Sequence, residues 1–343
     1  MKLLKKLTES FGPSGFEDET RKIVMEELKP LCSRVWVNTM GSVVGYKAGK
    51  AKKDKRKKIM VAGHIDEIGF LVSHVDDKTG FIRITPVGGF DPKNLVAQRV
   101  MVLGKGKHKL NGLLNFAGKP IHMQTPEDRK REMKVSDFYV DLGIPGKEAA
   151  GKVEVGDPVA WRRDFMQMGD CYNCKSMDDR VGVYVMIEAL RKCKGNTHDI
   201  YAVGTVQEEV GLRGATTSAY EIEPDIAIAL DVTLAMDTPG GEPHSKVSEL
   251  GKGITISIMN SAVISDRQLV KEFRTIAKRK KIPVQLEILP RGGTDAGAMQ
   301  RAKSGARAVT LSIPTRHVHS VNETVHKDDV QAGIDLLAAF LSQ

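Results

Sequence analysis

The chain has 343 residues, 41% of them hydrophobic, and its 52 lysines and arginines outnumber its 43 aspartates and glutamates to give a net charge of +9. This length suggests two domains with well-formed cores, which excludes a disordered protein. The longest apolar runs are far shorter than the ~18 residues that a membrane helix needs, so we expect no membrane span and no membrane partner. The N-terminus shows no readable secretory signal, which favours a cytoplasmic location.

Most of the net positive charge lies in one short segment. Eight basic side chains and one acid, Asp54, fall between Lys47 and Lys58, so this segment carries +7 and the rest of the chain only +2. A basic run can bind a polyanion, but this one contains no aromatic residue on which bases could stack. It joins two predicted strands, 42–46 and 59–62, as a hairpin connection would. We therefore expect a solvated loop and no nucleic-acid partner.

The four cysteines are too few for a disulfide framework in a chain of this length. Cys171 and Cys174 have the spacing of a redox pair or half a zinc site, but no second pair completes four-ligand coordination. Two incidental thiols near the start of a helix are the favoured interpretation.

The predicted elements begin with two helices and three strands. A short helix carries Leu3, Leu4 and Leu7, and a Gly-Pro turn separates it from a helix over 16–28 that Pro30 ends. Three strands are expected to follow, over residues 34–38, 43–46 and 59–62.

The pattern changes between Gly69 and Trp161. Short runs rich in Val, Ile and Phe are separated there by Gly, Asp and Pro, which predicts a small β domain. After it, helical and extended patterns alternate to the end of the chain. The expected helices are 178–193, 211–220, 266–280, 295–301 and 327–341, and the expected strands are 199–206, 225–230, 254–258, 284–289 and 308–313.

Such alternation is typical of an α/β fold in which helices flank a mixed sheet. The simplest architecture is an α/β domain, residues 1–68 and 163–343, interrupted by an inserted β-barrel-like domain, residues 69–162. The usual signatures of elbow-type serine hydrolases, zincins and P-loop enzymes are absent from the sequence. Acids and histidines at the ends of predicted strands are present instead.

The first of these sites is His64, which follows the strand 59–62. Asp66, two residues on, can lie on the same side and accept the second N–H of the imidazole, as metal-binding histidines require. The second site is the pair Asp178 and Asp179. Ser176 or Asp178 could cap the following helix, or Asp178 could bridge two cations, and the sequence leaves both readings open.

The third site is the pair Glu208 and Glu209, which ends an apolar strand. Neighbouring side chains of an extended segment point to opposite sides, so both glutamates cannot simply be solvated on one face. One can bind a metal ion while the other reaches the reacting water as general base.

Two further sites also lie near strand ends. Asp231 closes the apolar run 226–230, and His319 comes shortly after the strand 308–313. Taken singly, a helix cap explains Asp231 and a solvated loop explains His319 almost as well. Four of the five sites directly follow predicted strands, however, and ligands in open α/β sheets gather at the carboxyl ends of strands.

The candidate ligands are therefore His64, Asp178, Glu209, Asp231 and His319. Two imidazoles and three carboxylates, with one carboxylate shared, supply three protein contacts to each of two ions. This set of oxygen and nitrogen donors suits Zn²⁺ or Co²⁺, with Mn²⁺ as a third choice.

Six sequence motifs contain or adjoin these sites. They resemble, in order and over nearly the whole chain, the motifs of the dinuclear-metal aminopeptidases known as the tetrahedral or glutamyl aminopeptidase family. The motifs are GHIDEIGF (63–70), SMDDRVG (176–182), QEEVGLRGA (207–215), DVTLAMDTPG (231–240), RGGTDAGAMQ (291–300) and HSVNETV (319–325).

The resemblance implies a phosphorylase/peptidase-like catalytic domain with two ions, Zn or Co, in each subunit. By the same resemblance, His64, Asp178 and Asp231 hold one ion, and Asp178, Glu209 and His319 hold the other.

The resemblance further implies that Glu208 is the general base and that Asp66 orients His64. Short peptides with a free N-terminus are then the substrates. The family also implies that the β insertion makes dimer contacts and that dimers assemble into hollow tetrahedral dodecamers.

Two alternatives remain open at this point. Proteins of this family are often labelled endoglucanases, although a glycosidase needs two carboxyl groups and no metal, usually with aromatic platforms, and this chain has only two Trp. The non-enzyme alternative is a polyanion-binding protein that acts through the basic run.

Overall fold

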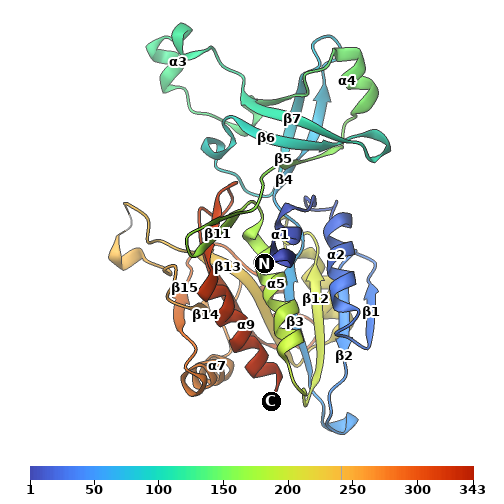
Figure 1. Ribbon diagram of the computed structural model, residues 1–343, viewed down its shortest axis with the longest axis vertical. Helices are drawn as coiled ribbons and strands as arrows, with labels where there is room; N and C mark the ends of the chain where they lie inside the picture. Colours follow the sequence, from blue (N-terminus) through green and yellow to red (C-terminus); the bar gives the residue numbers. More distant parts are fainter. Residues whose placement is uncertain (241) are drawn as a thin grey trace.

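The computed structural model describes residues 1–240 and 242–343, which form a large α/β part and a smaller closed β-barrel (Figure 1). The chain passes through the barrel once, and both termini lie in the α/β part. The barrel strands run from Gly69 to Trp161. The predicted fold class, a mixed α/β sheet with an inserted β-barrel, is thereby confirmed.

Within the described residues, the α/β part is built on an 11-stranded sheet in the order β1-β2-β12-β3-β13-β16-β17-β11-β10, with β14 and β15 added beside β16. The four strands β12, β3, β13 and β16 run parallel, so their carboxyl ends share one edge, and this edge faces the barrel (Figure 1). The strands of the sheet are β1 (Arg34–Val37), β2 (Val43–Lys47), β3 (Lys58–His64), β10 (Met166–Met168), β11 (Cys171–Cys174), β12 (Asp199–Thr205), β13 (Ile226–Leu234), β14 (Ile254–Met259), β15 (Val284–Ile288), β16 (Arg307–Arg316) and β17 (Glu323–His326).

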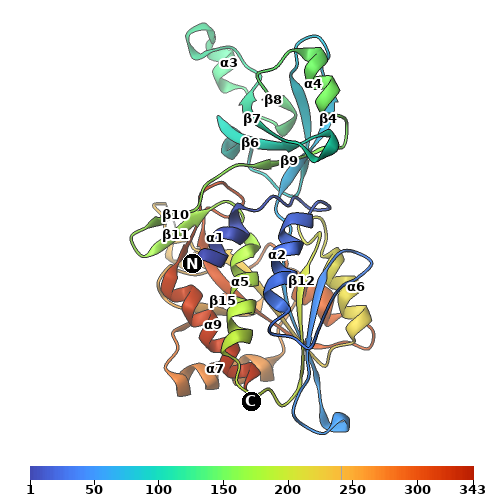
Figure 2. The ribbon, with the colours of Figure 1, turned by 45° about the vertical axis from the view of Figure 1, so that its right-hand side comes forward.

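Helices cover both faces of this sheet because its central strands are apolar on both sides. In β3, Ile59 and Val61 belong to the core under α1, α2, α5, α7 and α9, whereas Met60 and Ala62 belong to the core under α6 and α8. Figure 2 shows α6 across the sheet from α5 and α9. The helices are α1 (Lys2–Glu9), α2 (Asp18–Leu28), α5 (Met177–Lys192), α6 (Arg213–Ile222), α7 (Arg267–Lys280), α8 (Asp295–Gln300) and α9 (Lys327–Leu341), with 3-10 turns η1 (Lys53–Lys55) and η6 (Pro243–Ser245).

The barrel has its own apolar core, in which Phe70, Phe138 and Trp161 are buried. Its strand order is β4-β5-β8-β7-β6-β9. The elements of this part are β4 (Gly69–Val75), β5 (Ile82–Val87), β6 (Gln98–Leu103), β7 (Lys109–Phe116), β8 (Phe138–Asp141), β9 (Pro158–Trp161), α3 (Pro126–Lys130), α4 (Gly146–Lys152), η2 (Pro92–Leu95), η3 (Lys105–Lys107), η4 (Ile121–Met123) and η5 (Val135–Asp137).

The hairpin predicted around the basic run is wrong. β12 lies between β2 and β3, antiparallel to the first and parallel to the second. The run must therefore cross the amino end of β12, where Gly49 donates its backbone N–H to Asp199. Cys171 and Cys174 lie on β11, between β10 and β17, and this strand ends shortly before α5 begins. Over the described residues, no helix has both the length and the apolar character to cross a membrane.

Candidate metal centre

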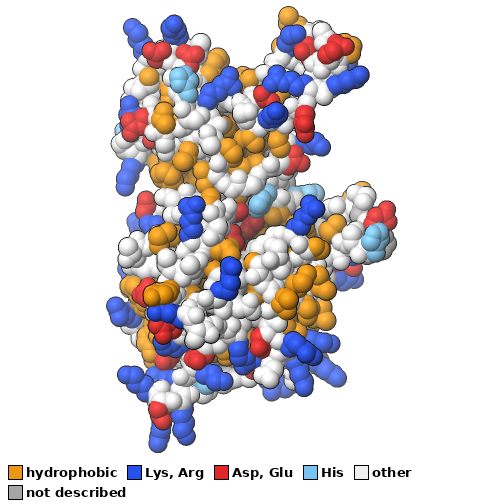
Figure 3. All heavy atoms as spheres, turned by 180° about the vertical axis from the view of Figure 1, so that it is seen from behind, with side chains coloured by type: hydrophobic (Ala, Val, Ile, Leu, Met, Phe, Trp, Pro, Cys, Tyr) orange, Lys and Arg blue, Asp and Glu red, His pale blue; other side chains and the backbone are white. Residues whose placement is uncertain are grey.

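Elements that are distant in the sequence bring acids and histidines together under the barrel. His64 ends β3, Asp178 lies at the start of α5, Asp231 lies in β13, Glu209 follows β12, and His319 lies in the loop between β16 and β17. Figure 3 shows acidic side chains at the bottom of a hollow between the barrel and the α/β part, with histidine beside them. All five candidate ligands thus meet at the carboxyl edge of the sheet.

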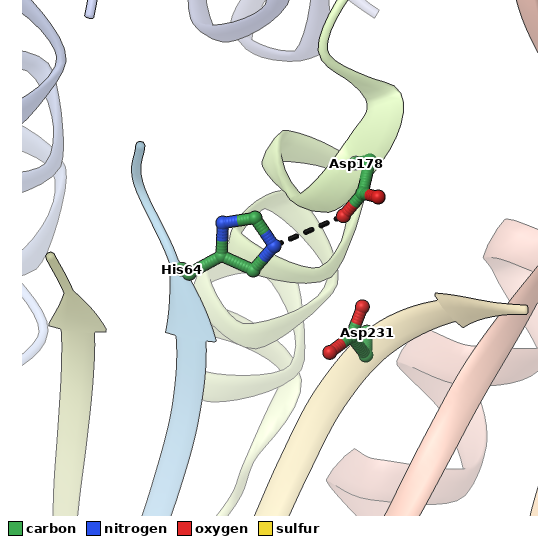
Figure 4. Close-up of side chains that lie close together, drawn as sticks. All are labelled: His64, Asp178 and Asp231. Atoms are coloured by element: carbon green, nitrogen blue, oxygen red, sulfur yellow. Dashed lines mark hydrogen bonds and ion pairs between the residues drawn. The ribbon is translucent and has the colours of Figure 1, made fainter. Parts of the chain in front are cut away.

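One group of possible ligands consists of His64, Asp178 and Asp231, all buried (Figure 4). Their ligand atoms lie within 4.8 Å of one another. His64 Nε2 lies 2.9 Å from Asp178 Oδ1. A single cation between these atoms could contact all three side chains.

The second group consists of Asp178, Glu209 and His319, with the same 4.8 Å limit between ligand atoms. Nε2 of His319 lies 3.4 Å from Asp178 Oδ2 and 3.4 Å from Glu209 Oε2. Asp178 therefore turns one carboxylate oxygen to each group. This is the arrangement expected of a carboxylate shared by two ions.

Asp66 connects the imidazole of the first group with the paired glutamates. Its carboxylate lies 3.4 Å from His64 Nδ1, and its backbone oxygen lies 3.2 Å from the same atom. The two carboxylate oxygens also accept the backbone N–H groups of Glu208, at 3.0 Å, and of Glu209, at 3.2 Å. Ser14 donates its hydroxyl to Asp66 at 2.6 Å. The buried carboxylate thus fixes both His64 and the glutamate loop.

Three acids of the site have raised pKa values. Burial raises the pKa of Glu208, Glu209 and Asp231, and repulsion from neighbouring carboxylates raises each of them further. Glu208 belongs to neither ligand group, although its half-buried side chain interacts with the charges of His64, Asp231 and Glu209. The site therefore gathers more negative charge than the protein compensates within the described residues.

The pKa values of the two histidines are also raised, but hydrogen bonds to carboxylates raise them against the effect of burial. Burial lowers the pKa of His319, but hydrogen bonds to Asp178 and Glu209 outweigh it and raise that pKa to about 12. His64 behaves likewise, since its bonds to Asp178 and Asp66 raise its pKa well above the usual range. The same two histidines lower the pKa of Asp178 despite its burial. In each imidazole, the nitrogen that would bind a cation, Nε2, thus lies beside carboxylate oxygens.

The donor set fits divalent cations. Imidazole nitrogens and carboxylate oxygens in overlapping groups of three suit Zn²⁺, Co²⁺ or Mn²⁺, and no thiol belongs to either group. The excess of buried carboxylates supports the same conclusion, because buried charges are stable only when they are paired or bind metal.

The alternative role of Ser176 or Asp178 as a helix cap is wrong. Ser176 caps no N–H of α5 with its side chain and donates instead to Glu67, while Asp178 has non-helical backbone angles. Asp179 takes the capping position, since its carboxylate accepts the N–H of Gly182 at 3.1 Å and that of His64 at 3.2 Å. Asp178 is therefore free to face the candidate ligands.

Sequence reasoning assigned no role at the metal centre to two buried acids that lie near it, Glu323 and Asp295. Glu323 accepts the backbone N–H groups of both Asp178 and His319. Asp295 accepts the hydroxyl of Thr205 at 2.5 Å, and burial raises its pKa to about 6. Both lie inside the motifs quoted above, but an acid that bonds only to the backbone or to one hydroxyl leaves no spacing pattern of its own.

The comparisons with known proteins cover almost the whole chain. A family model described as M42 glutamyl aminopeptidase matches residues 41–336. A lysyl aminopeptidase from Pyrococcus furiosus is 35% identical over an alignment 350 positions long, which covers 99% of this chain and 96% of that protein.

Two solved structures share the fold. An aminopeptidase from the archaeon Desulfurococcus kamchatkensis superimposes with a TM-score of 0.94 at 37% identity, covering 100% of this chain and 94% of that one. The TET1 peptidase of Pyrococcus horikoshii, described as assembling into a tetrahedron or a large octahedral shell, gives a TM-score of 0.86 at 29% identity, with coverage of 99% and 98%.

Proposed function

Because the chain belongs to the M42 glutamyl aminopeptidase family, we propose that it removes the N-terminal residue from short peptides by means of two divalent ions held at the carboxyl edge of its sheet. Its activity is that of an aminopeptidase, a hydrolase of peptide bonds. The observation that carries the two-ion proposal is the overlap of two ligand groups at a single carboxylate, Asp178.

Each ion would have three protein ligands. His64, Asp178 and Asp231 would hold one, and Asp178, Glu209 and His319 would hold the other. Zn²⁺ or Co²⁺ suits these donors, and such ions supply Lewis-acid activation of a water and of a carbonyl. The His319 side chain is 35% exposed, whereas those of His64, Asp178 and Glu209 are at most 9% exposed. We therefore place the substrate next to His319.

Glu208 is the proposed general base. It belongs to neither ligand group but interacts with the charges of His64, Asp231 and Glu209, and its raised pKa suits a residue that accepts and returns a proton. Its carboxylate would take a proton from the attacking water and deliver it to the leaving amine. Asp66 would keep His64 in the ligating orientation, as carboxylates beside metal-bound histidines do.

We also propose that the protein assembles with copies of itself, by analogy with the TET1 peptidase of Pyrococcus horikoshii. The barrel would make dimer contacts, and dimers would form a tetrahedral dodecamer that admits short peptides. A cytoplasmic location is part of the same proposal. No nucleic acid is needed for this activity.

The glycosidase alternative gains no support, because the matched family and the curated relative are aminopeptidases. The polyanion alternative concerns the basic run, which lies at the opposite end of the parallel strands and shares no residue with the ligand groups. It would describe a second property of the protein rather than its reaction.

A panel of aminoacyl reporters and β-glucan, each with and without chelator, tests the proposal. We expect chelator to abolish cleavage of the aminoacyl reporters and added Zn²⁺ or Co²⁺ to restore it, with two ions per chain by metal analysis. The panel also identifies the preferred first residue. Chelator-resistant glucan cleavage without peptide cleavage would refute the proposed function.

A further inference from the structure

Glu323 connects two candidate ligands without belonging to either ligand group. It is the first residue of β17 and is 2% exposed. One carboxylate oxygen accepts the backbone N–H of Asp178 at 3.0 Å, and the other accepts the backbone N–H of His319 at 2.8 Å. A single side chain thus spans the start of α5 and the loop between β16 and β17.

The backbone at both contacts is irregular and needs such support. His319 has φ of 60°, in the left-handed region, where a residue other than glycine costs on the order of 1–3 kcal/mol. Asp178 lies two residues after Ser176, which also has left-handed backbone angles, and the angles of Asp178 itself are not helical. Neither N–H is part of a regular helix or strand ladder, so Glu323 replaces the hydrogen bonds that regular structure would provide.

The barrel holds the same loop from the other side. Asn94, in η2, donates its side-chain N–H to the backbone oxygen of His319 at 3.3 Å. A Cβ added to Gly89 would lie 3.6 Å from Nδ1 of His319, so this part of the barrel borders the imidazole. The backbone of His319 is therefore held at its N–H by Glu323 and at its carbonyl by Asn94.

The position requires a carboxylate rather than an amide. Both oxygens of Glu323 act as acceptors, whereas a glutamine would offer one oxygen and would turn its NH₂ toward the second N–H. The strand itself is fixed independently, since Asn173 donates to the backbone oxygen of Glu323 at 3.2 Å. A change of the side chain alone can therefore disturb the two amide contacts while β17 stays in place.

We propose that Glu323 is a positioning residue of the metal centre, which sets the distance between Asp178 and His319 and so the geometry of the ion that these two residues share. This inference rests on the proposed two-ion function. It assigns to Glu323 no contact with the ions or the substrate.

Glu323→Gln tests the proposal, with Glu287→Gln as a matched control. Glu287 is equally buried, at 2% exposure, but lies on β15 and bonds to Thr255. Metal-free protein is titrated with Co²⁺ alone, in competition with a chelator, and the visible spectrum of Co²⁺ is recorded. Since loss of residues that support metal ligands typically weakens metal binding 10- to 100-fold, we expect a loss of about that size for one ion and an altered spectrum. Glu287→Gln should bind both ions as wild type does.

Unchanged affinity for both ions and an unchanged spectrum in Glu323→Gln would overturn the proposal, and so would an equal loss in Glu287→Gln. If Glu323→Gln does not fold, Glu323→Asp decides, because it keeps the charge but is too short to reach both amides. Weaker binding of one ion by that variant supports the proposal, and wild-type binding of both refutes it. A wild-type protein that binds fewer than two Co²⁺ would instead refute the two-ion function, which keeps the two failures distinct.

Discussion

The two ends of the parallel strands carry opposite charge in very different surroundings. At the carboxyl end, acids such as Asp66 and Asp178 are buried and bonded to imidazoles, hydroxyls and backbone amides. At the amino end, the basic run crosses β12 with Lys52, Lys53 and Lys55 exposed. Buried charges must be matched by specific partners, whereas exposed charges are screened by water and salt.

The comparison shows that the number of charges is a poor guide to their role. Residues 47–58 account for +7 of the net +9, yet Arg56 alone in this run forms an ion pair among the described residues, with Asp199. At the other end, three acids, Asp178, Glu209 and Asp231, form both ligand groups together with His64 and His319. Burial, rather than charge density, separates the end that holds the candidate ligands from the solvated one.

The strongest test of this comparison replaces one acid of the carboxyl end, Glu208, with an amide of the same shape. Glu208→Gln should lower turnover of an aminoacyl reporter by about 10²- to 10⁴-fold, the usual contribution of a general base. Both ions should remain bound, because Glu208 belongs to neither ligand group. Turnover and metal content are measured on the same preparation.

The matched control is Asp54→Asn, which removes the only acid of the basic run. Asp54 is exposed, so turnover should stay at the wild-type value. Wild-type turnover in Glu208→Gln would show that the base is a different residue, even if the enzyme class is right.

A second test concerns stability at the buried end. The guanidinium of Arg180 is fully buried and donates to Leu7 O at 2.9 Å and to Ser10 Oγ at 2.7 Å, with Glu67 3.8 Å away. Arg180→Met leaves these acceptors and part of the charge of Glu67 without a partner, so the free energy of unfolding should fall by about 3–5 kcal/mol. Denaturant unfolding with metal-free protein measures this change.

The corresponding arginine at the amino end is Arg56, whose ion pair with Asp199 is partly exposed. Arg56→Met should cost only about 0–1 kcal/mol. Equal losses in the two variants would remove the distinction between the ends.

Sequence patterns could predict the parts of the fold that depend on local periodicity. The alternating helices and strands after the barrel were predicted within a few residues of their observed limits, as for α9 (Lys327–Leu341) and β12 (Asp199–Thr205). β10, β11 and β17 were not predicted, because they are three or four residues long and are stabilised by pairing with one another and, for β17, with β16. The hairpin error at the basic run has the same origin, since β12 comes from a distant part of the chain.

The candidate site also has parts that sequence patterns predict and parts that they do not. Its five candidate ligands could be placed at one edge of the sheet because strand ends and residue types are visible in the sequence. Glu323 could not be recognised, because it bonds to backbone amides whose positions depend on the left-handed conformation of His319. Contacts of side chains with irregular backbone leave no residue pattern.

A third test asks whether burial shifts the pKa of an acid that lies outside the candidate metal centre. Burial raises the pKa of Glu287 above 4.5, although Thr255 and other hydroxyls oppose the shift. Below pH 4.5 both the folded and the unfolded chain hold this proton; as the pH rises, the unfolded chain loses it first, so the stability of the folded state falls. Glu287→Gln should therefore be more stable than wild type at pH 7, with the difference vanishing near pH 4. Unfolding curves at both pH values check this sign, and a difference that grows toward acid pH would contradict it.

The smallest effect is expected at the basic run. Replacing Lys52, Lys53, Lys55 and Lys57 with glutamine removes four exposed charges for which no ion pair or side-chain hydrogen bond is found among the described residues. The free energy of unfolding should change by no more than about 0.5 kcal/mol, because exposed side chains outside a network rarely contribute more. Turnover should stay at the wild-type value, since the run lies at the opposite end of the parallel strands from both ligand groups. Retention on an immobilised polyanion should weaken, which would separate the solvated charge from the chemistry, whereas a fall in peptide turnover would show that the amino end takes part in the reaction or in the assembly that supports it.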